Sequence, residues 1–481
     1  MDLELLWLIL ALLVGAFCAF SFGNLNRWRR RLNSLPPGDM GWPLIGNMWS
    51  FLRAFRSQNP ESFINNFKQR YGETGIYRTN LFGKPSIIVC SPDLCRKVLT
   101  DDENFQMGYP LSNLVFNGIS FDHISSSGNR WFRRLTTSGL NQQESLSSYV
   151  GKIEEIVTGS LEEWSRMKRP ILFFTEVNKI SFKVMMAIFL GSATDDTAIA
   201  TMEKYYTDVF GGLFCTPINI PGFAYNRAVK AREVLVKGIQ GVLSLRERKP
   251  DDHRNSKRGL VDFLREAEDQ KGEKLDDERV AIMLLLFLIA GRESSGRAAA
   301  WATLYLHDHP QVLHKAKEEQ EEIIKRRPCS QKGLTLNEIK QMKYLSKVID
   351  ETLRLRTNIF ALFREAKNDT YLNGFFIPKG WKVLVWQSAV HMDPEIYPNP
   401  KQFLPSRWDD FIPRGGAFLP FGAGSRTCIG ADLAKLEISI FLHYFLLNYK
   451  LEQLNPGGPV NYLPSSPDPA DNCPAKVIKI R

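Results

Sequence analysis

A glycine-rich stretch near the C-terminal end of the chain surrounds a single cysteine. Residues 418–437 read FLPFGAGSRTCIGADLAKLE, and Gly422, Gly424 and Gly430 lie close to the thiol of Cys428. Glycine permits positive φ and close backbone approach, so we expect a tight loop that wraps a flat ligand and points N–H groups at the sulfur. A lone cysteine beside an apolar helix is ordinarily a small buried hydrophobe. Here, however, five positions of the pattern F-x-x-G-x-R-x-C-x-G are filled, by Phe421, Gly424, Arg426, Cys428 and Gly430.

A second candidate group lies in the middle of a long apolar stretch. Residues 282–288 read IMLLLFL, and Glu293 and Ser294 follow shortly after them. An acid beside a hydroxyl, deep in an apolar element, is suited to deliver protons. The alternative is a solvated charge on a helix face, and the apolar residues just upstream argue against it.

A third group combines an acid with two arginines. Glu351 and Arg354 form an E-x-x-R pair, which falls on one face of a helix. Such a pair, taken alone, is usually a surface ion pair of small energetic value. Arg407, in the segment PSRW, lies between this pair and the cysteine loop in the sequence and is a candidate third member.

The elements predicted to position these groups are mostly helices. The acidic run that starts at Asp276 caps a helix of roughly 30 residues that ends before Pro310. Because the middle of this helix is apolar all round, it must cross the core of a large domain. The capping box Thr335–Glu338 precedes another helical stretch, which carries Glu351.

Strands are expected in two places. Residues 75–90 alternate apolar and polar side chains around Phe82-Gly83 and predict a hairpin. Between residues 370 and 390, Asn373-Gly374 and Lys379-Gly380 are turn signals that separate further strands.

The N-terminal residues predict a membrane anchor. Residues 5–22 carry no charge and are just long enough to span a bilayer as a helix. Arginines follow this run, whereas a secretory signal has its basic residues in front. We therefore predict an uncleaved anchor at residues 1–24, a basic, proline-rich hinge at 25–42, and one catalytic domain at 43–481 on the cytosolic side.

Composition excludes several classes of protein. The 481 residues are 44% apolar, which is enough for a sizeable core, and the formal net charge is +10. The basic residues are not interleaved with aromatic residues, so we expect no nucleic-acid partner. The seven cysteines include no C-x-x-C, which argues for a reducing compartment and against a disulfide framework or a zinc ribbon.

Taken together, the anchor, the proline hinge, the long helix, E-x-x-R, P-x-R-W and the cysteine loop resemble the cytochrome P-450 family over the whole chain. The resemblance implies a mainly α fold with a smaller β region and a haem b whose iron is bound axially by the Cys428 thiolate. It also implies a monomer that takes electrons from NADPH–cytochrome P-450 reductase at the endoplasmic reticulum membrane. The residues expected to contact haem are Arg133, Arg364, Phe421, Arg426 and Gly430, and the network behind it would be Glu351, Arg354 and Arg407.

Several positions depart from the family pattern. Ser294 replaces the usual threonine after the acid, and Ser406 stands where glutamate is usual. Asn129 occupies a position that is Trp or His in many relatives, while Thr427 and Ile429 flank the thiol in place of the usual Leu and Pro. By family position, the substrate pocket would be lined by residues 109–117, 288–293, 359–362 and 462–463.

More narrowly, segments such as LPPGDMGWPLIGN, IPKGWKVL and DLAKLEISIFLHYFL resemble the plant branch of ent-kaurenoic acid oxidases and triterpenoid oxidases such as β-amyrin 11-oxidases. This implies a monooxygenase acting on an unactivated C–H bond of a terpenoid, with a triterpenoid skeleton (cucurbitadienol- or β-amyrin-like) favoured over ent-kaurenoic acid. Two other classes stay open, a haem-thiolate isomerase or dehydratase of hydroperoxides and a non-catalytic haem sensor or sterol-binding membrane protein. Both are disfavoured by the presence of Glu293 and Ser294.

Overall fold

The computed structural model describes residues 34–109, 130–191, 196–213, 215, 218–248, 259–266, 274–463 and 467–480. The predicted anchor at residues 1–24, most of the hinge, and Asn129 lie outside these residues. Within the described ranges, no helix has both the length and the apolar character that crossing a membrane requires.

The described chain is mainly helical, as the sequence predicts. Its α-helices are α2 (Met48–Arg56), α3 (Glu61–Tyr71), α4 (Pro92–Thr100), α6 (Arg130–Asn141), α7 (Gln143–Arg166), α8 (Phe173–Leu190), α9 (Asp196–Gly212), α10 (Ala224–Arg248), α12 (Leu260–Glu266), α13 (Asp277–Asp308), α14 (Pro310–Lys325), α15 (Leu336–Gln341), α16 (Lys343–Leu355), α17 (Gln387–His391) and α18 (Ala431–Asn448). Two short 3₁₀ helices are η3 (Pro405–Trp408) and η4 (Gly424–Arg426).

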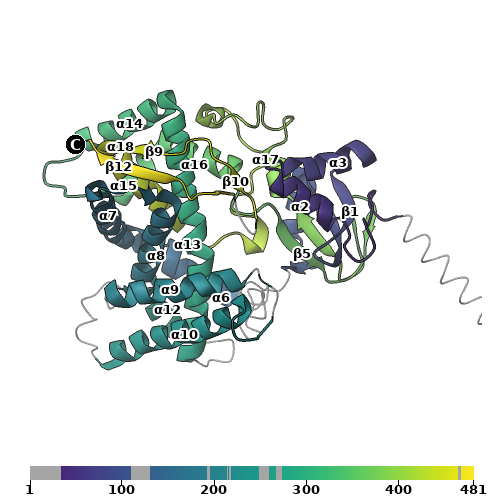
Figure 1. The fold of residues 1–481 in the computed structure, drawn as a ribbon, viewed down its shortest axis with the longest axis horizontal. Helices are drawn as coiled ribbons and strands as arrows, with labels where there is room; N and C mark the ends of the chain where they lie inside the picture. Colours follow the sequence, from purple (N-terminus) through teal and green to yellow (C-terminus); the bar gives the residue numbers. More distant parts are fainter. Residues whose placement is uncertain are drawn as a thin grey trace, which may run out of the picture.

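The central element is α13, which runs through the middle of the helical part (Figure 1). Its 32 residues begin where predicted, because the Asp276 side chain accepts a hydrogen bond of 2.8 Å from the backbone N–H of Arg279. Helices α8, α10, α16 and α18 pack against it. The contact with α8 is close at Gly296, where a Cβ would lie 2.3 Å from Asn178 Oδ1.

A five-stranded sheet forms the other part of the fold, on the opposite side of α13 from the bulk of the helices in Figure 1. Its order is β1-β2-β8-β5-β3, with β2 and β8 parallel and the other neighbours antiparallel. The chain's strands are β1 (Ile76–Leu81), β2 (Lys84–Val89), β3 (Phe105–Met107), β4 (Ile171–Leu172), β5 (Leu362–Ala366), β6 (Thr370–Leu372), β7 (Phe375–Ile377), β8 (Lys382–Val385), β9 (Tyr449–Gln453), β10 (Val460–Asn461), β11 (Asp468–Pro469) and β12 (Pro474–Lys479).

The predicted turns are confirmed. Phe82 (φ 55°) and Gly83 (φ 71°) join β1 to β2 with positive φ at both central positions, which suits a two-residue hairpin. Asn373 and Gly374 join β6 to β7 in the same way. Both faces of the five-stranded sheet are buried, because α4 packs on one face and the aromatic side chains of α2 and α3 pack on the other.

One helix differs from the prediction. The capping box at Thr335 is present, but it begins only the six-residue α15, and Glu351 lies on the separate helix α16. The break occurs at Met342. Glu319 of α14 stabilises the new start, since its carboxylate accepts hydrogen bonds of 2.6 and 2.9 Å from the backbone N–H groups of Tyr344 and Leu345.

Candidate active site

The cysteine loop, residues 418–430, is a tight loop that leads into α18. Gly422 and Gly424 both have φ of 73°, and a Cβ on Gly424 would lie 2.3 Å from the carbonyl oxygen of Leu99. Glycine is therefore required at position 424, both for its positive φ and because a side chain would not fit. The backbone N–H of Cys428 donates to the carbonyl of Phe421 at 2.8 Å, which closes the loop around the thiol.

The Cys428 residue is exposed, although protein atoms crowd its sulfur. Desolvation by these atoms raises the pKa of the thiol, while the Gly430 N–H and the charge of Arg133 act in the opposite direction. Because a metal ion deprotonates a coordinating thiol outright, this sulfur would become a thiolate on binding iron. The Gly430 N–H and Arg133 would then stabilise its charge.

Three arginines are candidates to hold a ligand at this loop, namely Arg426 in the loop itself, Arg133 on α6 and Arg364 on β5. Arg133 on α6 donates to the carbonyl of Thr427 at 3.0 Å, and Arg426 pairs with Asp102. Arg364 on β5 is 3% exposed, which excludes a surface position for this residue. Its Nη1 lies 3.7 Å from Met107 Sδ. Arg426 Nη1 lies 3.5 Å from the carbonyl of Phe105, at the other end of β3 from Met107. The guanidinium groups of Arg364 and Arg426 therefore both contact strand β3.

These residues fit a haem. The loop would supply the Cys428 thiol as a ligand to iron, and the arginines would supply cations for the haem carboxylates. The Nε of Arg426 is buried and has no hydrogen-bond partner among the described residues, so it can donate to an added anion. Asp102 neutralises part of this charge.

The predicted ion-pair network behind the loop is formed and buried. Glu351 and Arg354 are both fully buried and joined by two hydrogen bonds of 2.8 and 2.9 Å. Arg407 Nε donates to Glu351 Oε1 at 2.9 Å, and Trp408 Nε1 donates to Oε2 at 3.1 Å. The interpretation of Glu351 and Arg354 as a surface ion pair is therefore wrong, because the segment from Leu404 to Trp408 covers the Glu351 carboxylate.

His391 connects this network to the start of the cysteine loop. Its Nε2 accepts a hydrogen bond of 2.9 Å from the backbone N–H of Leu419, and its carbonyl accepts one of 2.8 Å from Arg354. Burial and the nearby Arg354 charge lower the pKa of this histidine to about 3, so the ring is neutral.

Glu293 and Ser294 are neighbours on α13, but their side chains make different contacts. Glu293 is buried between Arg292 (2.6 Å) and Arg297 (3.3 Å), and Asn178 donates to it at 3.2 Å. This excludes a solvated charge at position 293. The Ser294 hydroxyl donates to the carbonyl of Ala290 at 2.9 Å, within the helix.

Comparison with known proteins decides the family. The family model for cytochrome P-450 matches residues 36–466, about nine-tenths of the chain. The chain belongs to the cytochrome P-450 family. It is therefore a haem-thiolate enzyme, a cytochrome P-450 monooxygenase.

Individual relatives match this P-450 over nearly its full length. A 7,8-epoxymelianol synthase of Ailanthus altissima is 53% identical and covers 100% of this chain and 98% of its own. A β-amyrin 11-oxidase of Glycyrrhiza uralensis is 52% identical (95% and 94%), and ent-kaurenoic acid oxidase 2 of Arabidopsis thaliana is 50% identical (92% and 91%). Among solved structures, retinoic acid-bound cyanobacterial CYP120A1 has a TM-score of 0.77 at 28% identity, covering 93% and 99% of the two chains.

Sequence reasoning missed the partners that hold the acid of this P-450. Arg292 pairs with Glu203 of α9 at 3.0 Å and lies over the Tyr206 ring at 4.6 Å, and Arg297 pairs with Asp468 of β11 at 2.7 Å. Glu203 and Asp468 come from polar stretches with no distinguishing pattern, so nothing local in the sequence indicates this role.

A buried acid on α18 was also missed. Glu437 accepts a hydrogen bond from Ser181 of α8, whose hydroxyl lies 3.2 Å from that of Ser295 on α13. Burial raises the pKa of Glu437 to about 7. Here a signal existed, because a single acid within the apolar run LAKLEISIFL has to find a buried partner.

Proposed function

We propose that this P-450 oxidises an unactivated C–H bond of a terpenoid, using O₂ and electrons from NADPH, and that the terpenoid is a triterpenoid skeleton of the cucurbitadienol or β-amyrin kind. The observation that carries the chemistry is the exposed Cys428 thiol on a glycine-shaped loop with three arginines around it. The substrate class is supported by the full-length relatives, whose names refer to epoxymelianol, β-amyrin and ent-kaurenoic acid.

Haem b, when bound, supplies the oxygen-activating chemistry. In this proposal Cys428 holds the iron, Phe421 and Gly430 border the haem, and Arg133, Arg364 and Arg426 hold its carboxylates. The Ser294 hydroxyl is the proton donor on the substrate side. Glu293 lies nearby, and its two arginine partners hold its carboxylate in place.

The side chain of Arg292 supports a neutral substrate over a carboxylic acid. An arginine facing the pocket would favour ent-kaurenoic acid, which carries a carboxylate. In the structure, however, both Glu203 and Glu293 pair with Arg292, and aromatic rings cover its guanidinium. The positive charge of Arg292 is therefore already balanced by two carboxylates and does not favour a substrate carboxylate. Oxidation of ent-kaurenoic acid is the second candidate.

We also propose that the protein lies at the endoplasmic reticulum membrane as a monomer, held by residues 1–24, with NADPH–cytochrome P-450 reductase as its electron donor. Four large apolar residues at and just after the end of the predicted hinge support membrane contact. The exposed fraction is 76% for Trp42, 97% for Leu44, 59% for Ile45 and 68% for Trp49. The net charge of +10 suits both an anionic membrane surface and an acidic protein partner.

Replacement of the ligand residue tests the chemistry. Cys428→Ser should abolish the strongly red-shifted absorption of the reduced carbon-monoxide complex, because serine does not provide a thiolate. The exposed Cys329 is the matched control, and Cys329→Ser should keep the band. A Cys428→Ser protein that retains the band would overturn the ligand assignment.

Feeding experiments test the substrate class. The full chain is co-expressed with a plant reductase and supplied in parallel with β-amyrin, cucurbitadienol and ent-kaurenoic acid. We expect oxidised triterpenoid products that depend on the reductase. Gibberellin-type products alone would establish the second candidate, and turnover of a hydroperoxide without any reductase would establish an isomerase or dehydratase.

A further inference from the structure

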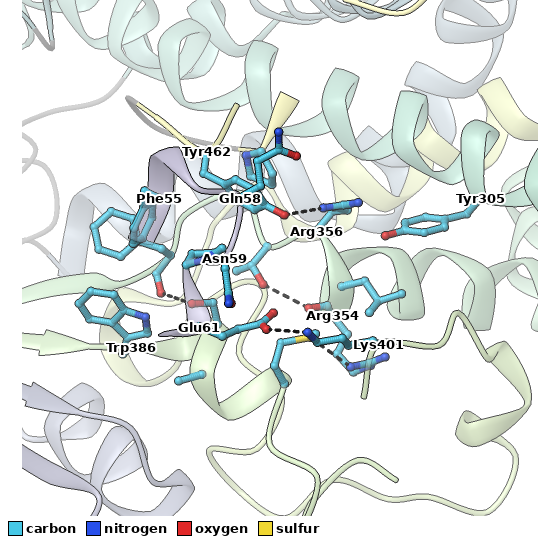
Figure 2. Close-up of a pocket in the computed structure, with 18 residues that line it drawn as sticks. Phe55, Gln58, Asn59, Glu61, Tyr305, Arg354, Arg356, Trp386, Lys401 and Tyr462 are labelled. Atoms are coloured by element: carbon cyan, nitrogen blue, oxygen red, sulfur yellow. Dashed lines mark hydrogen bonds and ion pairs between the residues drawn. The ribbon is translucent and has the colours of Figure 1, made fainter. Parts of the chain in front are cut away.

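A cavity of about 460 Å³ opens between the sheet part and the helical part of the fold (Figure 2). Its wall is made by α2 and α3 on one side and by the end of α13 and the segment after α16 on the other. None of Cys428, Glu293 and Ser294 lines it. Two lining residues, Phe360 and Tyr462, belong to segments that the family resemblance assigns to the substrate pocket, so the cavity shares these segments with that pocket.

Three basic side chains line this cavity, and they differ in how their charge is balanced. Arg354 is bound by Glu351, and Lys401 pairs with Glu61 of the same wall at 3.2 Å. In the part of the chain that the structure describes, no carboxylate pairs with Arg356. Its contacts are the Tyr462 hydroxyl at 3.2 Å and the rings of Trp301 and Tyr305, at 4.1 and 5.8 Å from the guanidinium carbon.

Arg356 is half-buried, and its Nε is buried with no hydrogen-bond partner among the described residues. A partly desolvated guanidinium gains from aromatic rings, but a charged acceptor stabilises it more. The cavity therefore contains one cation whose charge is available to a ligand, next to tyrosine hydroxyls that can also donate.

One part of the cavity wall is aromatic. Figure 2 shows Phe55 and Trp386 on the side of the cavity opposite Arg356 and Tyr305. The Phe360 ring lies 5.0 Å from Trp386 and 5.2 Å from Phe55. Trp386 and Phe55 are only 1% and 3% exposed, so the half-buried Phe360 provides most of the apolar surface of this cluster. Such a surface suits a flat apolar body.

From this arrangement, we propose that the cavity binds a small organic monoanion, with one carboxylate on Arg356 and a flat apolar body against the Phe360 ring. A carboxylate matches the guanidinium fork in a bidentate manner. A phosphate dianion fits less well, because among the described residues Arg356 is the one lining cation without a carboxylate partner, and the Glu61 carboxylate lines the same cavity. The proposal is independent of which terpenoid the enzyme oxidises.

Direct binding to the haem-loaded full-length protein tests the site. The probe is 2-naphthoate, and the matched neutral compound is 2-naphthamide. Isothermal titration calorimetry measures binding, while the haem absorption band shows whether the probe reaches the iron. We expect 2-naphthoate to bind in a 1:1 ratio without shifting the band, and 2-naphthamide to bind at least about tenfold more weakly.

Variants of Arg356 decide the role of its charge. Arg356→Gln should weaken 2-naphthoate binding at least about tenfold, and Arg356→Lys should weaken it less. Arg326, an exposed residue just after α14 that pairs with Glu322, is the control, and Arg326→Gln should leave binding unchanged.

Three results would overturn the proposal. These are equal binding of acid and amide, equal binding by wild type and Arg356→Gln, or a shift of the haem band that accompanies the measured binding. If Arg356→Gln does not retain haem, Tyr462→Phe replaces it. That variant removes only the hydroxyl beside the guanidinium and should weaken binding several-fold.

Discussion

At the scale of single residues, the hydrogen bonds of His391 determine its protonation. Because Nε2 accepts from Leu419, the proton of the neutral ring must be on Nδ1, which faces the Thr357 hydroxyl at 3.2 Å. Thr357 in turn donates to the carbonyl of Arg354 at 3.3 Å. A second proton on the ring would point at the Leu419 N–H, so the folded protein resists it.

This residue predicts acid sensitivity. In the unfolded chain the pKa of His391 returns to about 6.5, so below pH 6.5 the unfolded state binds a proton that the folded state does not take up until about pH 3. Acidification from pH 6.5 to 5 should therefore lower the free energy of unfolding by about 2 kcal/mol through this residue. The measurement is urea unfolding of wild type and His391→Gln at both pH values.

His391→Gln should show a pH dependence smaller by about that amount. The control is His314→Gln, at an exposed histidine on α14, which should keep the full pH dependence. An unchanged pH dependence in His391→Gln would show that the ring is not held neutral.

At the scale of elements, the contact between α13 and α8 requires glycine at position 296. An alanine there would place its Cβ 2.3 Å from Asn178 Oδ1 and 3.0 Å from Asn178 Cα. Although alanine favours helices by about 1 kcal/mol over glycine, the overlap with backbone should make Gly296→Ala destabilising by about 1–3 kcal/mol.

The matched control is Gly159→Ala in α7, where an added Cβ would meet nothing within 4 Å. This change should stabilise the protein by up to about 1 kcal/mol. The two alanine substitutions thus have opposite signs, and thermal unfolding followed by circular dichroism measures both. A Gly296→Ala protein that unfolds at or above the wild-type temperature would show that the helices can move apart freely.

The link between α16 and η3 depends on one carboxylate. Glu351→Ala removes the shared partner of Arg354 and Arg407, which leaves two buried guanidinium groups without it. We expect a destabilisation of about 3–5 kcal/mol and a large loss of haem content, measured from the haem absorption per mole of protein. Glu322→Ala, in an exposed pair on α14, should change neither quantity.

Elements with a local signal could be predicted from the sequence. The Asp276 cap, the Phe82-Gly83 turn and the cysteine loop each depend on residue types at short spacing, and all three are found in the structure. The break at Met342 depends on Glu319 from another helix. Glu293 is held by Asn178 of α8 and by two arginines whose other partners come from α9 and β11. Contacts between residues so far apart in the sequence cannot be predicted from the local sequence pattern.

At the scale of the whole molecule, the exposed residues Trp42, Leu44, Ile45 and Trp49 predict a second membrane contact beside the anchor. In bilayers that contain brominated lipid, tryptophan fluorescence of the full chain should be quenched. Trp42→Ser combined with Trp49→Ser should reduce this quenching, whereas Trp164→Phe, at a buried residue of α7, should not. Equal quenching in the double variant would mean that residues 42–49 stay in water.

The parallel pairing of β2 with β8 has a consequence for synthesis. Val89 lies beside Val385, so about 300 residues must be translated before β2 acquires its second neighbour. At roughly 5–20 residues per second, this takes about 15–60 s. During that time the apolar edge of β2 is open to pairing with other chains. We therefore expect the nascent protein to depend on chaperones, and growth at lower temperature during expression to increase the yield of folded enzyme.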